Sequence, residues 1–267
     1  MKQKKVYVTI VADVLSLGIV KTPGEMGADI AVGSVQRFGV PMGYGGPHPG
    51  YIACKDEHKR RLPGRIIGVS IDVHGNKSYR MALQTREQHI RRERATSNIC
   101  TAQALLANIS SFYGQWHGPA GIKDMAKRVR AYADILLSEL DHMKYTLVTK
   151  KDTHFDTVTV DVVASGLTSA DQVLAEFHKY GINLRKVDER HVQVAFNETT
   201  NLTDLDEIIE IFADIKGAKP TDNFSQGNYY ESKNYKELPN EIKRTTDFMK
   251  QGQFNDITSE TQMMRYI

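Results

Sequence analysis

The residues best suited to chemistry lie in a glycine-rich segment, residues 33–48, which holds five glycines and two prolines. Glycine adopts backbone conformations that other residues avoid, and proline fixes one torsion and lacks an N–H donor, so this segment is a loop. Clustered backbone N–H groups attract anions. Two interpretations stay open: a phosphate cradle, or a tight structural turn. The residues that we expect to contact a ligand or another subunit are Gly43, Tyr44, Gly45, Gly46 and His48.

Two charged features are further candidates. Asp13 follows an apolar run, residues 6–11, and α/β folds bind ligands at the carboxyl ends of their strands. The alternative is an aspartate that makes hydrogen bonds to nearby backbone. Arg86, Arg91 and Arg92 lie in a charged stretch, residues 85–94. Their guanidinium groups suit a phosphate or carboxylate, but such runs also form solvated faces or intersubunit salt bridges.

Other chemistries lack support in the sequence. It contains no HExxH motif, no Ser-His-Asp or Cys-His arrangement, and no metal-ligand spacing, so we expect no metal site. The two cysteines, Cys54 and Cys100, are expected to be reduced thiols. A net charge of +3, with basic residues interleaved with acids, predicts neither nucleic-acid nor membrane binding. No targeting segment is apparent, and we expect a bacterial-type cytoplasmic protein.

Several elements must position these residues. Apolar runs at 6–11, 30–32 and 51–54 predict buried strands of an α/β sheet, and apolar spacing predicts helices at 101–113 and 121–143. Strands are then expected at 145–149, 157–163, 182–187 and 191–196. Helices are expected after Ser169, which forms a capping-box pattern with Gln172, and at 203–216. This β-β-α-β-β-α order is typical of a small α+β domain.

The chain is therefore divided into residues 1–120, an α/β domain, residues 121–219, the small α+β domain, and residues 220–267. The last segment is polar with few apolar anchors, which predicts an extended arm or linker, with a short helix near 259–267.

Long motifs carry a family resemblance. Residues 27–30 and the loop at 33–48 resemble the P-protein of the glycine cleavage system, glycine dehydrogenase (decarboxylating), as do residues 63–70, 85–93 and 96–101. The match is to the C-terminal part of that family's N-terminal half. It implies an α/β fold: a partial aspartate-aminotransferase-like large domain (pyridoxal-phosphate fold type I), of which residues 1–120 would be a remnant, with a small α+β domain at 121–219. Residues 220–267 would then be an extended arm toward a missing catalytic half. Because much of the large domain's sheet would be missing, we expect exposed apolar surface and self-association.

The resemblance also implies a function. The intact enzyme would use pyridoxal phosphate to decarboxylate glycine and pass the aminomethyl group to lipoylated H-protein. In the family, the Schiff-base lysine belongs to the other half, in a His-Lys-Thr-Phe motif. Gln36 takes that lysine's place here, and an amide forms no imine. Asp13 falls near the aspartate that pairs with the cofactor's pyridine nitrogen, so Gln36 and Asp13 are pseudo-site positions.

The resemblance and the absence of the Schiff-base lysine leave two possible functions for the chain. In the preferred one, the chain is a non-catalytic fragment of the enzyme, with no catalytic residue and no cofactor of its own. It would pack on the catalytic C-terminal half within a homodimer. In the alternative, it is a non-enzymatic interaction module that docks H-protein or the catalytic half. An independent aminotransferase is rejected, because too much of the sheet is missing.

Overall fold

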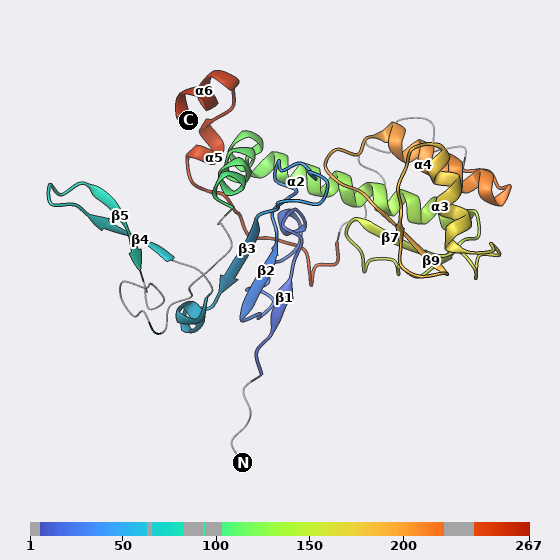
Figure 1. The fold of residues 1–267 in the computed structure, drawn as a ribbon, viewed down its shortest axis with the longest axis horizontal. Coiled ribbons are helices and arrows are strands. Elements are labelled where there is room, and N and C mark those ends of the chain that lie inside the picture. Colours follow the sequence, from blue (N-terminus) through green and yellow to red (C-terminus); the bar gives the residue numbers. More distant parts are fainter. Residues whose placement is uncertain (1–5, 63–65, 83–92, 94–102, 222–237) are drawn as a thin grey trace, which may run out of the picture.

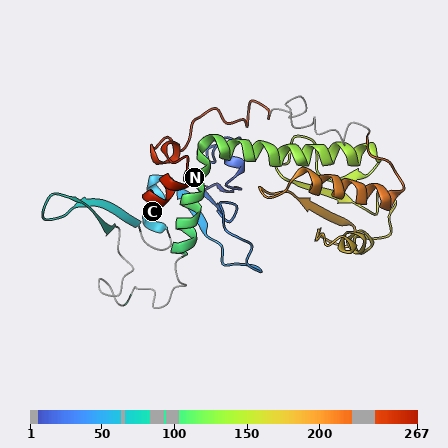
Figure 2. The same ribbon diagram turned by 90° about the horizontal axis from the view of Figure 1, so that it is seen from above.

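The computed structural model describes residues 6–62, 66–82, 93, 103–221 and 238–267. The central element is a long helix, α2 (Ala104–His142), which joins a small N-terminal sheet to an α+β unit (Figure 1). A hairpin of two strands, residues 66–82, lies at the end of the molecule opposite the α+β unit in both ribbon views (Figure 2). No helix within these ranges is long and apolar enough to cross a membrane.

The N-terminal sheet has the strand order β1 (Thr9–Val11), β2 (Ile30–Ser34), β3 (Gly50–Cys54). Strands β1 and β2 run parallel with Thr9 opposite Ile30, whereas β2 and β3 run antiparallel. The three predicted strands are confirmed, but the prediction that residues 6–11 form a buried strand is wrong. Val11 is 79% exposed, because β1 lies at the edge of a sheet with only three described strands. Two short 3-10 turns, η1 (Ser16–Gly18) and η2 (Asp56–Arg61), follow β1 and β3.

A second, two-stranded sheet was not predicted from the sequence. Strands β4 (Ile66–Ile71) and β5 (Lys77–Ala82) pair antiparallel, with Ile66 opposite Ala82. Alternate β4 side chains share one face of the hairpin, and Ile67, Val69 and Ile71 on that face are exposed. The expected exposure of apolar surface is therefore present.

Helix α2 joins the two helices that were predicted separately, and it bends where they were expected to part (Figure 2). Gly118 breaks the helical conformation with φ 61° and ψ 177°, and Pro119 follows it inside the helix. Proline lacks an N–H donor, and its ring clashes with the preceding turn, which accounts for the kink. The segment before the kink is less buried than predicted, since Leu105 is exposed.

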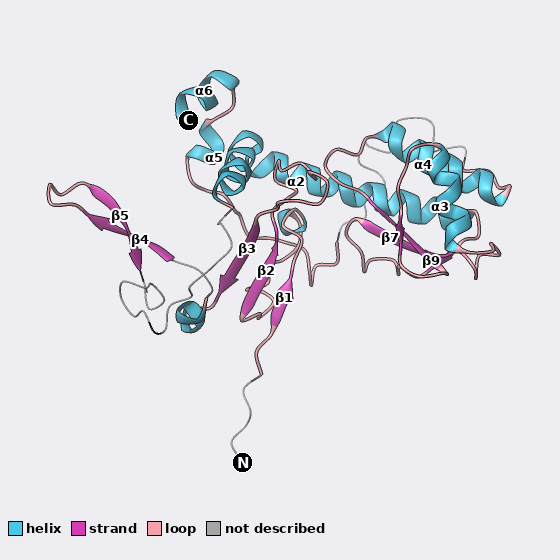
Figure 3. Ribbon diagram, viewed as in Figure 1, coloured by secondary structure: helices cyan, strands magenta, loops and turns pink. Residues whose placement is uncertain are grey.

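The α+β unit follows the predicted β-β-α-β-β-α order (Figure 3). Its antiparallel sheet has the order β6 (Thr146–Leu147), β7 (Thr157–Asp161), β9 (His191–Ala195), β8 (Arg185–Lys186), and its helices are α3 (Ala170–Lys179) and α4 (Leu202–Lys216). The N-cap is confirmed, since Ser169 Oγ accepts the Gln172 N–H at 3.3 Å, whereas Gln172 Oε1 accepts the N–H of Thr168 and not that of Ser169. Apolar side chains of β7, β9, α3 and α4 pack with the later part of α2 in one core.

The C-terminal residues lie back against the rest of the chain. The Lys21 N–H donates to the Ile242 carbonyl, and the Arg244 N–H donates to the Ile19 carbonyl, both at 2.8 Å. Helix α5 (Gln253–Asp256) contacts α2, and α6 (Glu260–Tyr266) confirms the predicted short helix. The Tyr266 hydroxyl accepts a hydrogen bond from the Gln115 amide at 3.2 Å. Buried Leu238 and Ile257 are apolar anchors that the sequence analysis missed.

Candidate functional site

The residue next to Gln36 organises the site. Arg37 follows β2, and its guanidinium lies 3.1 Å from Asp13 Oδ2, 2.5 Å from Asp156 Oδ2 and 4.0 Å from Glu198 Oε2. It also donates to the Phe196 carbonyl at 2.6 Å. Only 13% of the Arg37 side chain is exposed. One buried cation therefore ties the glycine-rich loop both to the end of β1 and to the α+β unit.

Gln36 is bonded within its own loop. Its side-chain Nε2 donates to the Val40 carbonyl at 2.6 Å, and its backbone N–H donates to Ser34 Oγ at 3.1 Å. The amide therefore closes a turn. A carboxamide nitrogen is not a nucleophile, and this one is also held by a backbone carbonyl.

Asp13 has two kinds of partner. Its Oδ1 accepts the N–H groups of Leu15 and Ser16 at 2.9 and 3.0 Å, which confirms the alternative of local backbone bonding. Its Oδ2 pairs with Arg37, a contact that no local pattern indicates. Both oxygens are therefore engaged by groups of this chain.

The predicted contact residues of the loop lie at its exposed tip. Gly43, Gly45 and Gly46 adopt positive φ values of 55°, 108° and 135°, and Tyr44 is fully exposed with φ 56°. The N–H groups of Gly45 and Gly46 both donate to the Met42 carbonyl at 3.0 Å, so the two bond within the turn. His48 is also exposed. The role of these residues as an interface remains a prediction.

Close backbone approach does occur at the start of the loop. A Cβ on Gly33 would lie 2.3 Å from the Ala12 carbonyl oxygen and 2.5 Å from the Tyr51 ring. The Tyr51 hydroxyl donates to the same Ala12 carbonyl at 2.9 Å. Glycine at this position is thus required by packing between strands.

Arg86, Arg91, Arg92 and Cys100 lie outside the described residues, and Cys54 is a partly buried free thiol on β3.

A groove of about 630 Å³ opens between the loop and the region of the α2 kink. Burial raises the pKa of Glu198 and of Tyr113. Burial also lowers the pKa of His117, and nearby Arg128 lowers it further. Buried Glu198 Oε2 and Arg128 Nε make no hydrogen bond. The groove is lined by Gly39, Val40, Pro41, Tyr113, His117, Gly121, Asp124, Met125, Arg128, Glu198 and Thr199.

This groove can receive a polar group, but its chemistry is limited. A carboxyl and an imidazole that are both shifted toward their neutral forms can donate and accept hydrogen bonds. No lysine is among the lining residues, so none of them can form an imine with a carbonyl compound. Outside the glycine-rich loop, none of these residues could be predicted from the sequence, because they come from α2 and from the residues after β9 and share no local pattern.

The family model for the glycine cleavage system P-protein matches residues 1–212. A putative mitochondrial glycine dehydrogenase (decarboxylating) of Schizosaccharomyces pombe is 47% identical over 98% of this chain and 26% of its own length. The glycine dehydrogenase (decarboxylating) of Photobacterium profundum is 46% identical over 99% of this chain and 26% of its own. The chain thus spans about a quarter of the length of these curated relatives.

Solved structures agree. A crystal structure of glycine decarboxylase (P-protein) in inhibitor-bound form matches with a TM-score of 0.66 and 32% identity, over 78% of this chain and 48% of that one. The apo cysteine desulfurase of Thermococcus onnurineus matches with a TM-score of 0.52 and 16% identity, over 79% of this chain and 53% of that one, which bears on the fold alone. The expected fold, a partial fold type I large domain with a small α+β domain, is confirmed.

Proposed function

The chain belongs to the glycine cleavage system P-protein family, and we propose that it is a non-catalytic part of a glycine dehydrogenase (aminomethyl-transferring). The proposed activity of the intact enzyme is decarboxylation of glycine with transfer of the aminomethyl group to lipoylated H-protein. Pyridoxal phosphate, bound by another part of the protein, would supply an electron sink for the carbanion left when CO₂ departs.

One observation carries this proposal: the residues at the pseudo-site do not fit the cofactor. Gln36 stands where the resemblance places the Schiff-base lysine, and its amide is bonded to the Val40 carbonyl. The carboxylate of Asp13, which would face a pyridine nitrogen, is paired with Arg37. The nucleophile is thus absent, and the counter-charge is already used by a side chain of the same loop. No step of the reaction is assigned to this chain.

The proposed contribution of the chain is structural. The Arg37 ion pairs hold the loop in place between the β1 end and the α+β unit, and the groove beside it offers hydrogen-bonding groups but no lysine. We expect these surfaces to lie against the catalytic part of the intact homodimer and to help shape the entrance used by lipoylated H-protein.

Cofactor binding by the chain alone tests the proposal. Pyridoxal phosphate is added to the wild-type chain, and absorbance in the internal-aldimine band is followed by borohydride reduction and mass analysis of peptides. We expect no band and no peptide labelled specifically at the loop. A stoichiometric aldimine fixed by borohydride on the wild-type chain would contradict the proposal. The Gln36→Lys variant is the matched comparison, and we expect it to bind little cofactor because Asp13 remains paired with Arg37.

A second function is favoured by one feature, the exposed apolar face of β4. Such patches commonly mark interaction surfaces, so the chain can also be proposed as a module that docks H-protein or the catalytic half without enzymatic activity. Titration of the chain with lipoylated H-protein separates the two functions. Saturable binding in the absence of the catalytic half supports the module, whereas no binding at high concentration counts against it.

A further inference from the structure

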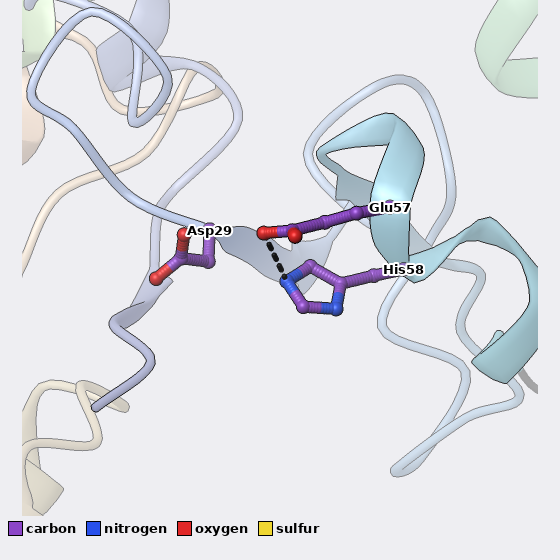
Figure 4. A group of neighbouring side chains, drawn as sticks. All are labelled: Asp29, Glu57 and His58. Carbon is purple, nitrogen blue, oxygen red and sulfur yellow. Dashed lines mark ion pairs between the residues drawn. The ribbon is translucent and has the colours of Figure 1, made fainter. Parts of the chain in front are cut away.

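A cluster of three potential metal ligands lies on the side of the first sheet where β2 begins and β3 ends. Asp29 directly precedes β2, while Glu57 and His58 belong to η2, just after β3 (Figure 4). Each offers one ligand atom, and the three atoms lie within 4.8 Å of one another. His58 Nε2 lies 3.5 Å from Glu57 Oε1, and Figure 4 shows Asp29 across from these two side chains. The backbone holds the segments together, because the Lys55 N–H donates to the Asp29 carbonyl at 3.0 Å.

The imidazole gives an independent reason to expect a ligand. His58 is only 7% exposed, and the ring of Tyr7 packs edge-on against it at 4.9 Å between centroids. Its Nε2 is buried, faces Glu57, and makes no hydrogen bond. A buried polar atom without a hydrogen-bond partner is costly, which is why such atoms are uncommon in folded proteins. An ion bound at Nε2 would satisfy it.

The carboxylate of Asp29 is already paired with a cation. Lys55 Nζ lies 2.7 Å from Asp29 Oδ1, while Asp29 Oδ2 accepts the Val8 N–H at 2.9 Å. The hydrogen bond from Lys55 is the main cause of the lowered pKa of Asp29. Because 51% of the Lys55 side chain is exposed, its ammonium can move to solvent and leave Oδ1 to another cation.

We propose that Asp29, Glu57 and His58 form a binding site for one divalent transition-metal ion of the Zn²⁺ class. One imidazole nitrogen and two carboxylate oxygens are ligands that Zn²⁺ takes at about 2.0–2.2 Å, with water in the remaining position. The ligand atoms must therefore draw closer than they are now. Glu57, whose side chain is 49% exposed, can make most of that movement. The site is independent of the proposed function and runs against the expectation, drawn from spacing, of no metal site.

Zinc titration of the 267-residue chain tests the site, by calorimetry and by the visible spectrum of bound Co²⁺. We expect one ion per chain at the cluster. His58→Gln and Glu57→Gln should each weaken that binding about tenfold or more, the range found when even outer-shell partners of metal ligands are lost. Lys55→Met should tighten it about two- to fivefold, the equivalent of one exposed ion pair.

Controls separate this site from adventitious binding by other histidines. His74 is exposed in the turn between β4 and β5, so His74→Gln should leave affinity and stoichiometry unchanged. Circular dichroism establishes that each variant is folded. Should His58→Gln fail to fold, Glu57→Gln and Lys55→Met, both at exposed positions, decide the outcome. The proposal is overturned if Glu57→Gln binds as tightly as wild type, or if His74→Gln abolishes the only site.

Discussion

At the scale of single residues, Arg37 departs most from what its neighbourhood in sequence suggests. It lies in a loop that was predicted from its glycines, yet its guanidinium pairs with Asp13, Asp156 and Glu198. An arginine suits this role because its planar fork donates to several acceptors at once. In the proposed pseudo-site, the Gln36 amide offers no nucleophile, and Arg37 beside it pairs with Asp13.

Loss of Arg37 should destabilise the chain. Arg37→Ala leaves Asp156 and Glu198 partly buried without their cation, and we expect the free energy of unfolding to fall by about 1.5–3 kcal/mol, as for hydrogen bonds to charged groups. Urea unfolding followed by circular dichroism measures this. Lys59→Ala is the control, because Lys59 makes an exposed pair with Asp56 that should contribute little. Equal effects of the two variants would show that the Arg37 contacts add no stability.

A buried network within the α+β unit should make stability depend on pH. Burial opposes ionisation of Asp134, but hydrogen bonds from His154 and Arg130 at 2.9 and 3.2 Å outweigh it and lower the pKa of Asp134 below 3.8. A carboxyl with a lowered pKa in the folded state stabilises that state above its unfolded pKa, and this stabilisation is lost as pH falls through the folded value.

We therefore expect unfolding free energy to drop below about pH 4, the ordinary pKa of aspartate, and this drop to be smaller in Asp134→Asn. Urea unfolding between about pH 3 and pH 6, on either side of that pKa, measures both. Asp141→Asn, at an exposed position on the same helix, should keep the wild-type pH dependence. An unchanged acid profile in Asp134→Asn would refute the assignment.

At the scale of elements, the kink in α2 decides how the N-terminal sheet and the α+β unit are joined. Gly118 and Pro119 end one helical direction and begin another, while the helix continues as one element from Ala104 to His142. The C-terminal arm packs at this kink, since the Phe254 carbonyl lies against Gly118. The bend and the docking of α5 are thus parts of one arrangement.

Substitution of Gly118 should disturb both the bend in α2 and the docking of α5. Alanine would have to adopt φ 61°, and its Cβ would lie 2.9 Å from the Phe254 carbonyl oxygen. We expect Gly118→Ala to lower the free energy of unfolding by about 1–3 kcal/mol, the cost of a strained backbone position. Thermal and urea unfolding measure it. Gly24→Ala is the comparison, because no atom lies within 4 Å of the place that its Cβ would take, and it should change stability much less.

At the scale of the whole molecule, the described residues form one well-packed core and leave apolar surfaces with nothing described over them. The core lies mainly in the α+β unit and the later part of α2, and Leu15, Ile19 and Leu238 join it from the N-terminal region and the C-terminal arm. In contrast, Val11 on β1 and Ile67, Val69 and Ile71 on β4 are exposed. Relatives about four times as long match the chain over nearly all of its length, and we expect other parts of those proteins to cover the corresponding surfaces.

The isolated chain should therefore self-associate. We expect sedimentation velocity to show oligomers at micromolar concentration that diminish in Val69→Lys, because a charge on the apolar face of β4 opposes contact between copies. Ser70→Lys places the same charge on the opposite face of the strand and should have a smaller effect. A monomeric wild-type chain, or equal effects of the two lysines, would contradict this.

The sequence alone was sufficient for features that depend on residues close together along the chain. Glycine and proline spacing predicted the loop, the Ser169 cap and the apolar periods predicted the α+β unit, and long motifs predicted the family. Each of these patterns lies within a few tens of residues, because backbone torsion, capping and amphipathic spacing are local properties.

Only the tertiary structure decided which distant groups meet. It brought Asp156 and Glu198, more than a hundred positions away, to Arg37, and it set Asp29 beside His58. It also left β1 exposed, although its apolar residues resemble those of a buried strand. The physical reason is the same in each case: burial and charge pairing depend on which elements pack together, and local residue patterns do not reveal that packing.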